Sequence, residues 1–358
     1  MTKKILFIVS NLKVGGGAEK SVTLITKGLK EHYDVELLTF YKHEKEYEYY
    51  VKRHDLGYTP ANSIIKKGLR YFLFAPYKLS RFLRKNKYDL VVSNISDTNL
   101  LTLITKGIFY KKFKLWSNIR CYMTIPIYKK TFPLYKNADK IIVLTKALQQ
   151  HTKYPSTVIN NAIETQIINH KKKLNIKKED QKLFNKKTIL MVGRLTEQKN
   201  HKWFITEVFN KLKQDINLII LGTGPLEKEL KELTKNNPNI HFLGVKENPY
   251  TYMNKADIFV LPSLFEGMPR ALMESLACGT TSIANDCETG PREILNVPLN
   301  KEINTYQKTK YGYLVPFNDA QEYQKAIVHA LKQKKKPEPD TRYELKNIIK
   351  KWVEEIES

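Results

Sequence analysis

The sequence contains few cysteines and no long apolar run. Its 358 residues include three cysteines, Cys121, Cys278 and Cys287, which are too few and too scattered for a disulfide framework or for a zinc site built from cysteines alone. A reducing compartment is therefore expected. No segment approaches the roughly 20 apolar residues needed to cross a bilayer, and the run Ile5–Val9 is too short for a secretory signal. If a membrane is involved, we expect the protein to lie on its surface.

Acidic side chains are also scarce, and most of the shortage falls in the first half of the chain. Lys and Arg number 61 against 36 Asp and Glu, a net charge of +25. Residues 1–160 hold 29 basic and 11 acidic side chains, whereas residues 161–358 hold 32 and 25. A membrane surface, a phosphorylated ligand or nucleic acid would suit such a charge, and so would a lysine-rich background composition. No recognised nucleic-acid motif is present, so we expect no nucleic-acid partner.

One basic stretch also carries many apolar side chains. No acidic residue occurs from Leu56 to Tyr88, and residues 64–88 hold eight Lys and Arg. The apolar residues among them are Ile64, Ile65, Leu69, Phe72, Leu73, Phe74, Leu79, Phe82 and Leu83. This pattern is typical of a helix lying in an anionic membrane interface, and the basic stretch Lys106–Lys114 adds to it. The alternative is that the apolar face packs on the sheet of its own domain.

Short apolar runs alternate with helical patterns along the whole chain. The predicted strands are Ile5–Val9, Val35–Phe40, Leu90–Ser93, Lys114–Ser117 and Lys140–Leu144, then Thr188–Val192, Asn217–Leu221, His241–Leu243, Ile258–Leu261, Thr281–Ala284 and Tyr313–Val315. The helical patterns include Ser21–Lys30, His201–Lys213, Pro225–Thr234 and Ala320–Lys332. Short runs bounded by turn residues, with helices between them, indicate parallel sheets covered on both faces. Two such series predict two doubly wound α/β domains.

Polar segments separate these parts. We predict an N-terminal domain over residues 1–162 and a C-terminal domain over 163–338, whose first residues 163–187 form a lysine-rich linker. The break Lys332–Asp340 carries charge and prolines without an apolar period. Residues 339–358 then contain a helix, Tyr343–Glu355, with one apolar face. A terminal helix of this kind must dock on another part of the chain.

The first candidate for ligand binding is the glycine-rich segment VGGGAEKS, Val14–Ser21. Gly16 and Gly17 follow the first strand and precede a helix, where the backbone can approach a ligand and the helix N-terminus favours an anion. The segment matches neither the dinucleotide fingerprint nor the Walker A loop. A tight strand–helix turn is the alternative interpretation.

Two cations follow the strand Thr188–Val192, in the segment MVGRLTEQKNH. Arg194 and Lys199 lie on the loop at the carboxyl end of that strand, where open α/β sheets bind ligands. Such a pair suits a diphosphate, although two solvated loop cations would look the same. The segment LGTGPLE, Leu221–Glu227, reads as a turn, because Glu227 occupies the place of the third glycine of a nicotinamide fingerprint.

Two acids stand on either side of a helix start in FEGMPRALMESLACG. Pro269 suits the first turn and Gly279 the position after the end, so a helix is predicted over about Pro269–Cys278. Its first-turn N–H groups could bind phosphate oxygens, with Glu266 and Glu274 accepting hydrogen bonds from hydroxyls on either side. A helix-dipole acid followed by an exposed glutamate is the alternative.

Taken together, these segments resemble the family-four retaining nucleotide-sugar glycosyltransferases. The segments GRLTEQKNH, LGTGPLEKEL, LFEGMPRALMESLACG and NDCETGPREIL stand in the family's order and spacing, and VGGGAEKS and VINNAIE match as well. The resemblance covers nearly the whole chain and is densest over residues 188–295. It implies the GT-B fold, two Rossmann-like domains facing across a cleft. Within the family the chain is similar to bacterial N-acetylgalactosaminyl and hexosyl transferases acting on undecaprenyl-diphosphate-linked or surface glycans.

The resemblance also implies a role for each matching residue. Arg194 and Lys199 would hold the donor diphosphate, Glu266 the hydroxyls of the donor sugar, and Glu274 the ribose hydroxyls. The backbone contacts to the donor would come from Gly16, Gly17, Gly267, Met268, Pro269, Ala271 and Leu272. Many members carry a histidine near the sugar, but the corresponding segment here, WSNIRC, has none. Asn118 or Arg120 could take over part of its positioning role.

We therefore expect a retaining glycosyltransferase at the cytoplasmic face of the membrane. It would move a hexosyl or N-acetylhexosaminyl unit, GalNAc, GlcNAc or Gal, from a UDP-sugar to a lipid-linked or surface glycan. No Asp-x-Asp motif occurs, so neither a metal nor another cofactor is expected, since cations and a helix N-terminus can stabilise the diphosphate. The alternatives are the same chemistry on a soluble acceptor and a sugar-nucleotide epimerase of the same architecture.

Overall fold

The structure, a computed structural model, describes residues 2–58, 74–121, 133–212, 215–333 and 337–358. It divides into two compact units, each of which is described by itself. Unit 1 comprises Met1–Ala162 and Leu345–Ser358, and unit 2 comprises Ile163–Glu344. Each contains a seven-stranded, mainly parallel sheet with helices packed against it. The prediction of two doubly wound, Rossmann-like α/β domains is confirmed.

Unit 1 has the strand order β3-β2-β1-β4-β5-β6-β7, with every neighbouring pair parallel. The strands are β1 Lys4–Val9, β2 Asp34–Thr39, β3 Lys52–Asp55, β4 Leu90–Asn94, β5 Leu115–Ile119, β6 Lys140–Val143 and β7 Ser156–Val158. The helices are α1 Gly17–Leu29, α3 Ala75–Lys85, α4 Ser96–Ile104, α6 Lys146–Gln150 and α15 Leu345–Glu357, and the π-helical turn η2 spans Thr105–Phe109. The prediction missed β3 and β7, because these short edge strands contain no apolar run.

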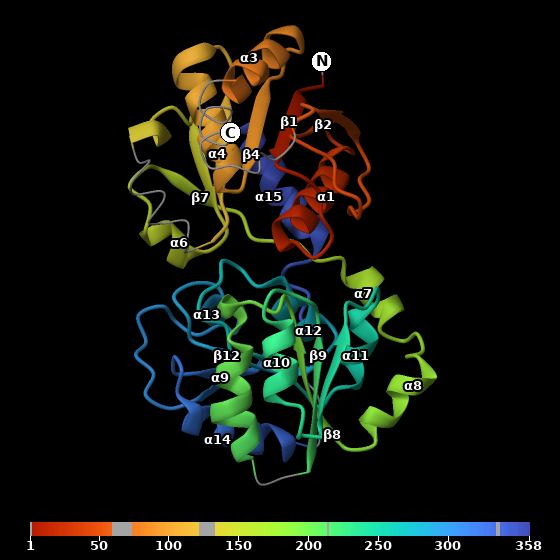
Figure 1. Ribbon diagram of the computed structural model, residues 1–358. Helices are drawn as coiled ribbons and strands as arrows, with labels where there is room; N and C mark the ends of the chain where they lie inside the picture. The colour runs from red at the N-terminus through yellow and green to blue at the C-terminus, as the bar shows by residue number, and fades with distance from the viewer. Residues whose placement is uncertain (1, 59–73, 122–132, 213–214, 334–336) are drawn as a thin grey trace. The chain divides into compact units, whose positions relative to one another are not determined.

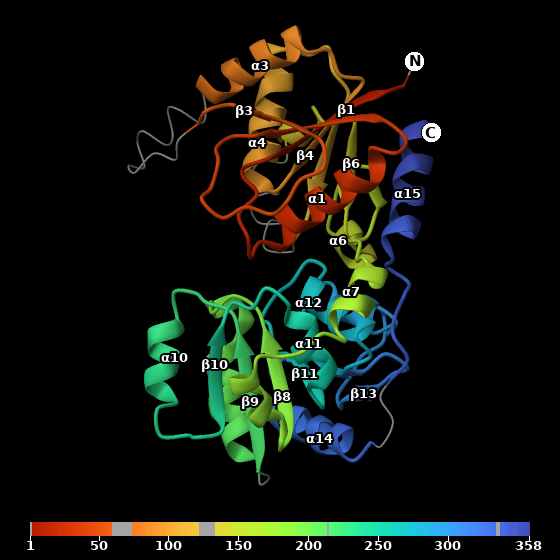
Figure 2. The same ribbon diagram turned by 90° about the vertical axis from the view of Figure 1, so that its right-hand side faces the viewer.

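The C-terminal helix α15 belongs to unit 1. Figures 1 and 2 both show it beside α1, which lies more than 300 residues earlier in the sequence. Trp352 is buried, with its ring centroid 5.7 Å from that of Phe7 and 6.2 Å from that of Trp116. Gly28 in α1 permits the contact, since a Cβ added there would lie 2.4 Å from Cγ1 of Ile349. The apolar face predicted for the terminal helix therefore completes the core of unit 1.

A buried acid holds the edge of the unit 1 sheet together. The Glu36 carboxylate on β2 accepts a hydrogen bond from Tyr88 at 2.5 Å and contacts Nε2 of His54 at 2.7 Å. It also forms ion pairs with Lys4 at 3.2 Å and Lys52 at 3.3 Å. Burial would raise the pKa of Glu36, but these hydrogen bonds outweigh it and lower the pKa to about 2. The ring of Phe82 in α3 packs on His54 and Tyr88, so α3 is fixed to this edge.

Unit 2 has the strand order β10-β9-β8-β11-β12-β14-β13, and only the pairing of β13 with β14 is antiparallel. The strands are β8 Lys187–Val192, β9 Ile216–Leu221, β10 Ile240–Gly244, β11 Ile258–Leu261, β12 Thr281–Asn285, β13 Gln307–Lys308 and β14 Tyr313–Val315. The α-helices are α7 Thr165–Lys171, α8 Lys178–Gln181, α9 His201–Trp203, α10 Glu227–Leu233, α11 Pro249–Lys255, α12 Arg270–Ala277, α13 Pro291–Ile294 and α14 Ala320–Leu331. Further helical turns are η4 Lys182–Phe184, η5 Glu197–Lys199, η6 Phe204–Val208 and η7 Phe209–Lys211. The prediction missed β13, which is two residues long.

Two predicted boundaries need correction. Residues 163–187 form α7, α8 and η4 rather than a free linker, because Asp180 accepts hydrogen bonds from Tyr252 at 2.6 Å and Lys246 at 2.8 Å. The end of unit 2 also lies later than residue 338. The Asp340 N–H donates to the Leu276 carbonyl at 3.1 Å, and α15 begins at Leu345 rather than Tyr343. These polar contacts involve residues far apart in sequence, which no local pattern reveals.

The basic segment of unit 1 is described in part. Residues 64–73, including five of its apolar residues, lie outside the described part of the chain. In α3, Leu79 and Leu83 are buried against unit 1, so the expectation that they face a membrane is wrong. Phe74 and Tyr77 are exposed by 61% and 50%. Across the described residues, no helix is both long and apolar enough to span a bilayer.

Replacing Gly28 with Ala should destabilise unit 1. Ala normally gains up to about 1 kcal/mol over Gly in a helix interior, but here overpacking against Ile349 should cost about 1–3 kcal/mol. Labelling with 5-fluorotryptophan separates the units in urea unfolding, because Trp116 and Trp352 lie in unit 1 and Trp203 lies in unit 2. Lys351→Ala, on the exposed side of α15, is the control. A stabilised Gly28→Ala variant would contradict the packing.

Candidate functional site

The predicted cations and acids of unit 2 lie where the order of its strands reverses. From β8 the chain proceeds to β9 and β10 on one side of the sheet and then returns to β11 on the other side of β8. The loops after β8 and β11 therefore lead away in opposite directions from the carboxyl edge. Open α/β sheets bind ligands outside the carboxyl ends of the strands at such a point. Residues 193–200 and 262–269 form these two loops.

Close backbone packing fixes the loop after β8. A Cβ on Gly222, whose φ is +141°, would lie 1.8 Å from the Gly193 carbonyl oxygen, and one on Gly224 would lie 2.3 Å from that of Leu195. The N–H groups of Gly193 and Leu195 donate to the carbonyls of Leu221 and Thr223, each at 3.0 Å. The segment predicted as a turn thus supports the loop that carries Arg194.

Lys199 and Glu266 meet at this point of the sheet. Lys199 Nζ lies 2.5 Å from Glu266 Oε1, and Glu266 is only 5% exposed. A buried carboxylate requires such a partner, because removing one member of a buried pair leaves an uncompensated charge. Arg194 on the same loop is exposed, and its side chain forms no hydrogen bond or ion pair within the described residues. Of the two predicted cations, Lys199 is therefore paired with an acid, whereas the Arg194 side chain is unpaired among the described residues.

Helix α12 starts beside this pair. Its N-cap, Pro269, provides no side-chain hydrogen bond, so the first-turn N–H groups, including those of Ala271 and Leu272, remain available to an anion. Glu274 is 7% exposed, and its Oε1 lies 3.1 Å from Arg270 Nη2. The alternative of an exposed mid-helix glutamate is therefore wrong. Gly279, with φ +79°, follows the end of the helix as predicted.

The loop after β12 packs against the segment that carries Glu266. A Cβ on Gly290, whose φ is +93°, would lie 2.5 Å from the Gly267 carbonyl oxygen and 2.7 Å from Pro269 Cδ. Gly267 and Met268 are both buried beneath this contact. None of the residues predicted for the site lies in the segment NDCETGPREIL, which belongs to this loop. A Thr-Gly-Pro turn shortly after a buried strand was the available signal.

In unit 1, Gly16 and Gly17 lie at the start of a helix as predicted. Gly16 is the N-cap of α1 and Gly17 its first residue, and no side chain caps this terminus. A Cβ on Gly16 would lie 1.9 Å from Oε2 of Glu19, so the glutamate side chain folds back over the turn. The first-turn N–H groups of α1 can therefore donate hydrogen bonds to a bound anion in place of the glutamate.

The two residues predicted to replace the family histidine differ in accessibility. Asn118 is 1% exposed and its Nδ2 donates to Asn94 Oδ1 at 3.3 Å, and its positioning role stays a prediction. It is the second-last residue of β5, in which the Ser117 hydroxyl bonds to Ser93 in β4 and the Asn118 carbonyl accepts from Asn99 in α4. Arg120 is half-buried, and its Nη2 donates at 2.5 Å to Asn161 Oδ1, which also accepts from Ser21 in α1 at 2.9 Å. Arg120 thus lies beside α1.

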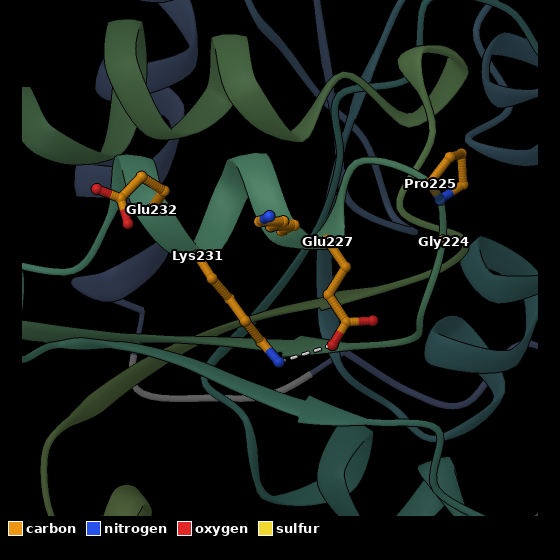
Figure 3. A pocket seen from close by; sticks show the side chains of 6 residues that line it. Gly224, Pro225, Glu227, Lys231 and Glu232 are labelled. Carbon is orange, nitrogen blue, oxygen red and sulfur yellow. Dashed lines mark hydrogen bonds and ion pairs between the residues drawn. The ribbon is translucent and has the colours of Figure 1, made fainter.

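A shallow pocket beside α10 contains none of the predicted site residues. Gly224, Pro225, Glu227 and Lys231 line it together with Lys228 and Glu232, and the side chains of Glu227 and Lys231 form an ion pair at 2.7 Å (Figure 3). The pair lies one helical turn apart on a surface open to solvent, a common arrangement on exposed helices. We assign no ligand to this pocket.

Residues 186–333 match the model of a protein family that is described as Glycosyl transferases group 1. An uncharacterized glycosyltransferase of Methanocaldococcus jannaschii is 32% identical over 274 residues, which cover 68% of this chain and 67% of that protein. A Campylobacter jejuni protein is 28% identical over 325 residues, which cover 82% of this chain and 86% of that one. It is named N-acetylgalactosamine-N,N'-diacetylbacillosaminyl-diphospho-undecaprenol 4-alpha-N-acetylgalactosaminyltransferase.

Solved structures share the architecture of the chain. HepE of Anabaena in complex with UDP and glucose aligns with a TM-score of 0.77 at 17% identity, covering 99% of this chain and 100% of that one. The apo form of the lipopolysaccharide outer core galactosyltransferase WaaB aligns with a TM-score of 0.69 at 17% identity, covering 99% of each chain. At this identity the likeness concerns the fold, and it agrees with the GT-B architecture expected from the sequence.

His201 stands next to the loop of Lys199 as a buried neutral base. It begins α9, is 1% exposed, and its Nδ1 has no hydrogen-bond partner within the part of the chain that the structure describes. Burial, and then the charge of Lys199, lowers the pKa of His201 from 6.5 to about 4. Protonating it in the folded state is therefore costly.

This histidine should make unit 2 lose stability as the pH falls from 6.5 toward 4. Across that window the unfolded chain binds a proton that the folded chain rejects, which should cost about 2 kcal/mol between pH 7 and pH 5. Urea unfolding followed by the Trp203 fluorine signal measures the loss. His201→Leu should lose about 2 kcal/mol less than the wild type over the same interval. Equal losses in the two proteins would show that His201 does not titrate as stated.

Proposed function

Because the chain belongs to the glycosyl transferases of group 1, we propose that it transfers a hexosyl or N-acetylhexosaminyl unit from a UDP-sugar to a lipid-linked or surface glycan. GalNAc, GlcNAc and Gal are the proposed sugars. Relatives named as N-acetylgalactosaminyl and galactosyl transferases for undecaprenyl-diphosphate-linked substrates support this choice. Membership of this family also favours glycosyl transfer over the alternative reaction, epimerisation of a sugar nucleotide.

The observation that carries the proposal is the Lys199–Glu266 pair beside the start of α12. A cation, a carboxylate and a row of uncapped N–H groups lie together where the strand order reverses. The carboxylate suits sugar hydroxyls, while the cations and N–H groups suit a diphosphate. Glu274 lies one turn further along α12, where it would accept hydrogen bonds from the ribose. In unit 1, Gly16 and Gly17 remain candidates for a phosphate contact.

The proposed reaction keeps the configuration of the anomeric carbon. The acceptor hydroxyl attacks that carbon on the face from which the diphosphate leaves. The bond from carbon to phosphate oxygen breaks, the bond to the acceptor oxygen forms, and the acceptor proton passes to a phosphate oxygen. Glu266 orients the sugar and forms no covalent bond. Arg194 and Lys199 stabilise the charge that develops on the leaving diphosphate, which is the role of a metal ion in other transferases, so the reaction is proposed to need none.

We also propose that unit 1 lies on the cytoplasmic face of an anionic membrane through a surface on α3 and η2, called the α3 surface. It consists of Phe74, Tyr77, Lys78, Arg81, Arg84, Lys85 and Ile108. Ile108 is 72% exposed, and the ring of Tyr77 packs 6.4 Å from that of Phe109, which joins the two elements. Exposed aromatic and aliphatic groups beside basic ones favour binding at an anionic interface. This surface is separate from the buried face of Leu79 and Leu83.

Substituting the two acids should separate their roles. Glu266→Gln should lower kcat by about 10³-fold or more, because the sugar loses the carboxylate that orients it in the transition state. Glu274→Ala should mainly raise the donor KM, by about tenfold, because ribose binding contributes equally to ground and transition states. Transfer is measured with UDP-GalNAc, UDP-GlcNAc and UDP-Gal and a polyprenyl-diphosphate sugar, with a chelator present.

Glu232→Ala, on the exposed face of α10, is the matched control, and fluorine unfolding curves establish that each variant is folded at the assay temperature. Full activity of Glu266→Gln would overturn the site assignment. Activity that requires added divalent metal would overturn the metal-independent route. Equal transfer to soluble and lipid-linked sugars would favour the soluble acceptor.

Charge reversal on the α3 surface should weaken membrane binding. Arg81→Glu with Lys85→Glu should lower affinity for phosphatidylglycerol vesicles on the order of tenfold to a hundredfold, since each basic residue near such a surface contributes about 1 kcal/mol. Binding of the wild type should also weaken with salt. Lys42→Glu with Lys45→Glu changes net charge equally at exposed positions elsewhere in unit 1. Equal losses in both double variants would indicate non-specific attraction.

A further inference from the structure

The segment 265–267 determines where the Glu266 carboxylate points. It lies in the loop between β11 and α12, outside any helix or strand. A site residue on a loop is held precisely only when neighbouring groups hold the backbone on either side. Two residues so far without a role, Gln198 and Thr289, make these contacts. Each comes from the loop of a strand adjacent to β11.

Gln198 holds the segment from the side of β8. Its backbone carbonyl accepts the Leu264 N–H at 2.9 Å, and its side-chain Nε2 donates to the Phe265 carbonyl at 2.9 Å. Gln198 directly precedes Lys199 in η5. The same residue therefore sets the distance between the two loops that carry the Lys199–Glu266 ion pair.

Thr289 holds the segment from the side of β12. Its Oγ1 donates to the backbone carbonyl of Glu266 at 2.5 Å, and the residue is 1% exposed. The neighbouring Gly290 packs on the Gly267 carbonyl, so a side chain cannot be placed between the two loops. Because the Thr289 hydroxyl is buried and already bonded to the backbone, it acts on a ligand only through Glu266.

A second set of hydrogen bonds fixes the base of the same loop. Asn285 Nδ2 at the end of β12 donates to the Pro262 carbonyl at 2.9 Å and to Asn318 Oδ1 at 3.2 Å. Asn200, next to Lys199, donates to the same Asn318 oxygen at 3.1 Å. The loops after β8, β11, β12 and β14 are thus joined, which leaves the segment 265–267 little freedom to shift as a whole.

We propose that Gln198 and Thr289 are positioning residues that hold Glu266 against Lys199 for sugar transfer. The inference rests on the proposed function, in which Glu266 orients the donor sugar. A displacement of about 1 Å at such a group lowers turnover on the order of a hundredfold. Loss of either hydrogen bond should therefore reduce kcat while donor affinity, which depends also on the diphosphate and ribose contacts, changes little.

Thr289 offers a matched pair of substitutions. Thr289→Val keeps the shape and loses the hydroxyl, and it should lower kcat ten- to a hundredfold with donor KM within about threefold. Thr289→Ser keeps the hydroxyl and should retain kcat within about threefold. Gln198→Leu should resemble Thr289→Val, since it removes the donor to the Phe265 carbonyl. Equal kcat for the Val and Ser variants would overturn the role of Thr289.

Thr280→Val controls for the loss of a buried hydroxyl as such. Thr280 is also fully buried in unit 2, and its Oγ1 donates to the Met253 carbonyl at 2.6 Å, at the amino end of β12. Both Val variants should lower the stability of unit 2 to a similar degree, but only Thr289→Val should lower kcat. If Thr280→Val and Thr289→Val lowered kcat equally, the loss would be explained by reduced stability of unit 2, and the positioning role of Thr289 would be refuted.

A crystal structure of Thr289→Val provides a readout independent of turnover. The carboxylate of Glu266 should leave its place 2.5 Å from Lys199 Nζ. An unmoved ion pair would refute the positioning role even if the wild type transferred no sugar to any acceptor tested. A fully active Glu266→Gln variant, by contrast, would refute the proposed role of Glu266 in sugar transfer. It would not change the finding that Thr289 holds the Glu266 backbone.

Discussion

The close contact of four loops at the carboxyl edge of the unit 2 sheet is the constraint on which the proposed site depends. At positions 222, 224 and 290 only glycine fits, because a Cβ added there would lie within 3 Å of the backbone of a neighbouring loop. Gly222 and Gly224 join the loop after β9 to the loop after β8, and Gly290 joins the loop after β12 to the loop after β11. Gln198 then links the loops after β8 and β11 by two hydrogen bonds. The ion pair of Lys199 with Glu266 follows from these contacts, since a buried carboxylate is stable only beside a fixed cation. The position of the charged side chains in the site therefore depends on the backbone contacts between the loops.

Unit 1 satisfies a different requirement. It buries the apolar face of the last helix, α15, against Phe7 and Trp116, so the two ends of the chain belong to one core. At one edge of its sheet the Glu36 cluster fixes β3 and α3, and α3 then presents basic and aromatic groups on its outer side. The buried apolar groups and the exposed basic and aromatic groups lie on opposite sides of the same helix. The two interpretations of the basic stretch are thus compatible for α3.

Much of this could be predicted from local patterns. The long apolar strands, the two-domain organisation and the start of α12 after a Glu-Gly-Met-Pro segment are confirmed. The strands β3, β7 and β13 could not be found, because their edge positions demand no apolar run. Residues 163–187 looked like a linker because nothing in the segment itself shows that Asp180 is buried. Its partners, Tyr252 and Lys246, follow about seventy residues later. The burial of Asn118 likewise depends on residues distant in sequence, since its carbonyl accepts from Asn99 in α4.

The sequence by itself determined the residue types and their order: two cations after one strand, two acids around one helix start, glycines where backbones meet. These are properties of short segments, and neighbouring residues impose them through turn geometry and periodicity. Only the tertiary structure decided which of the charged groups are paired. It buried Glu266 beside Lys199 and Glu274 beside Arg270, and it left Arg194 exposed. It also brought Gln198 and Thr289 to opposite sides of one loop. Strand order is responsible, because β8 and β12 become neighbours of β11 only when the sheet forms.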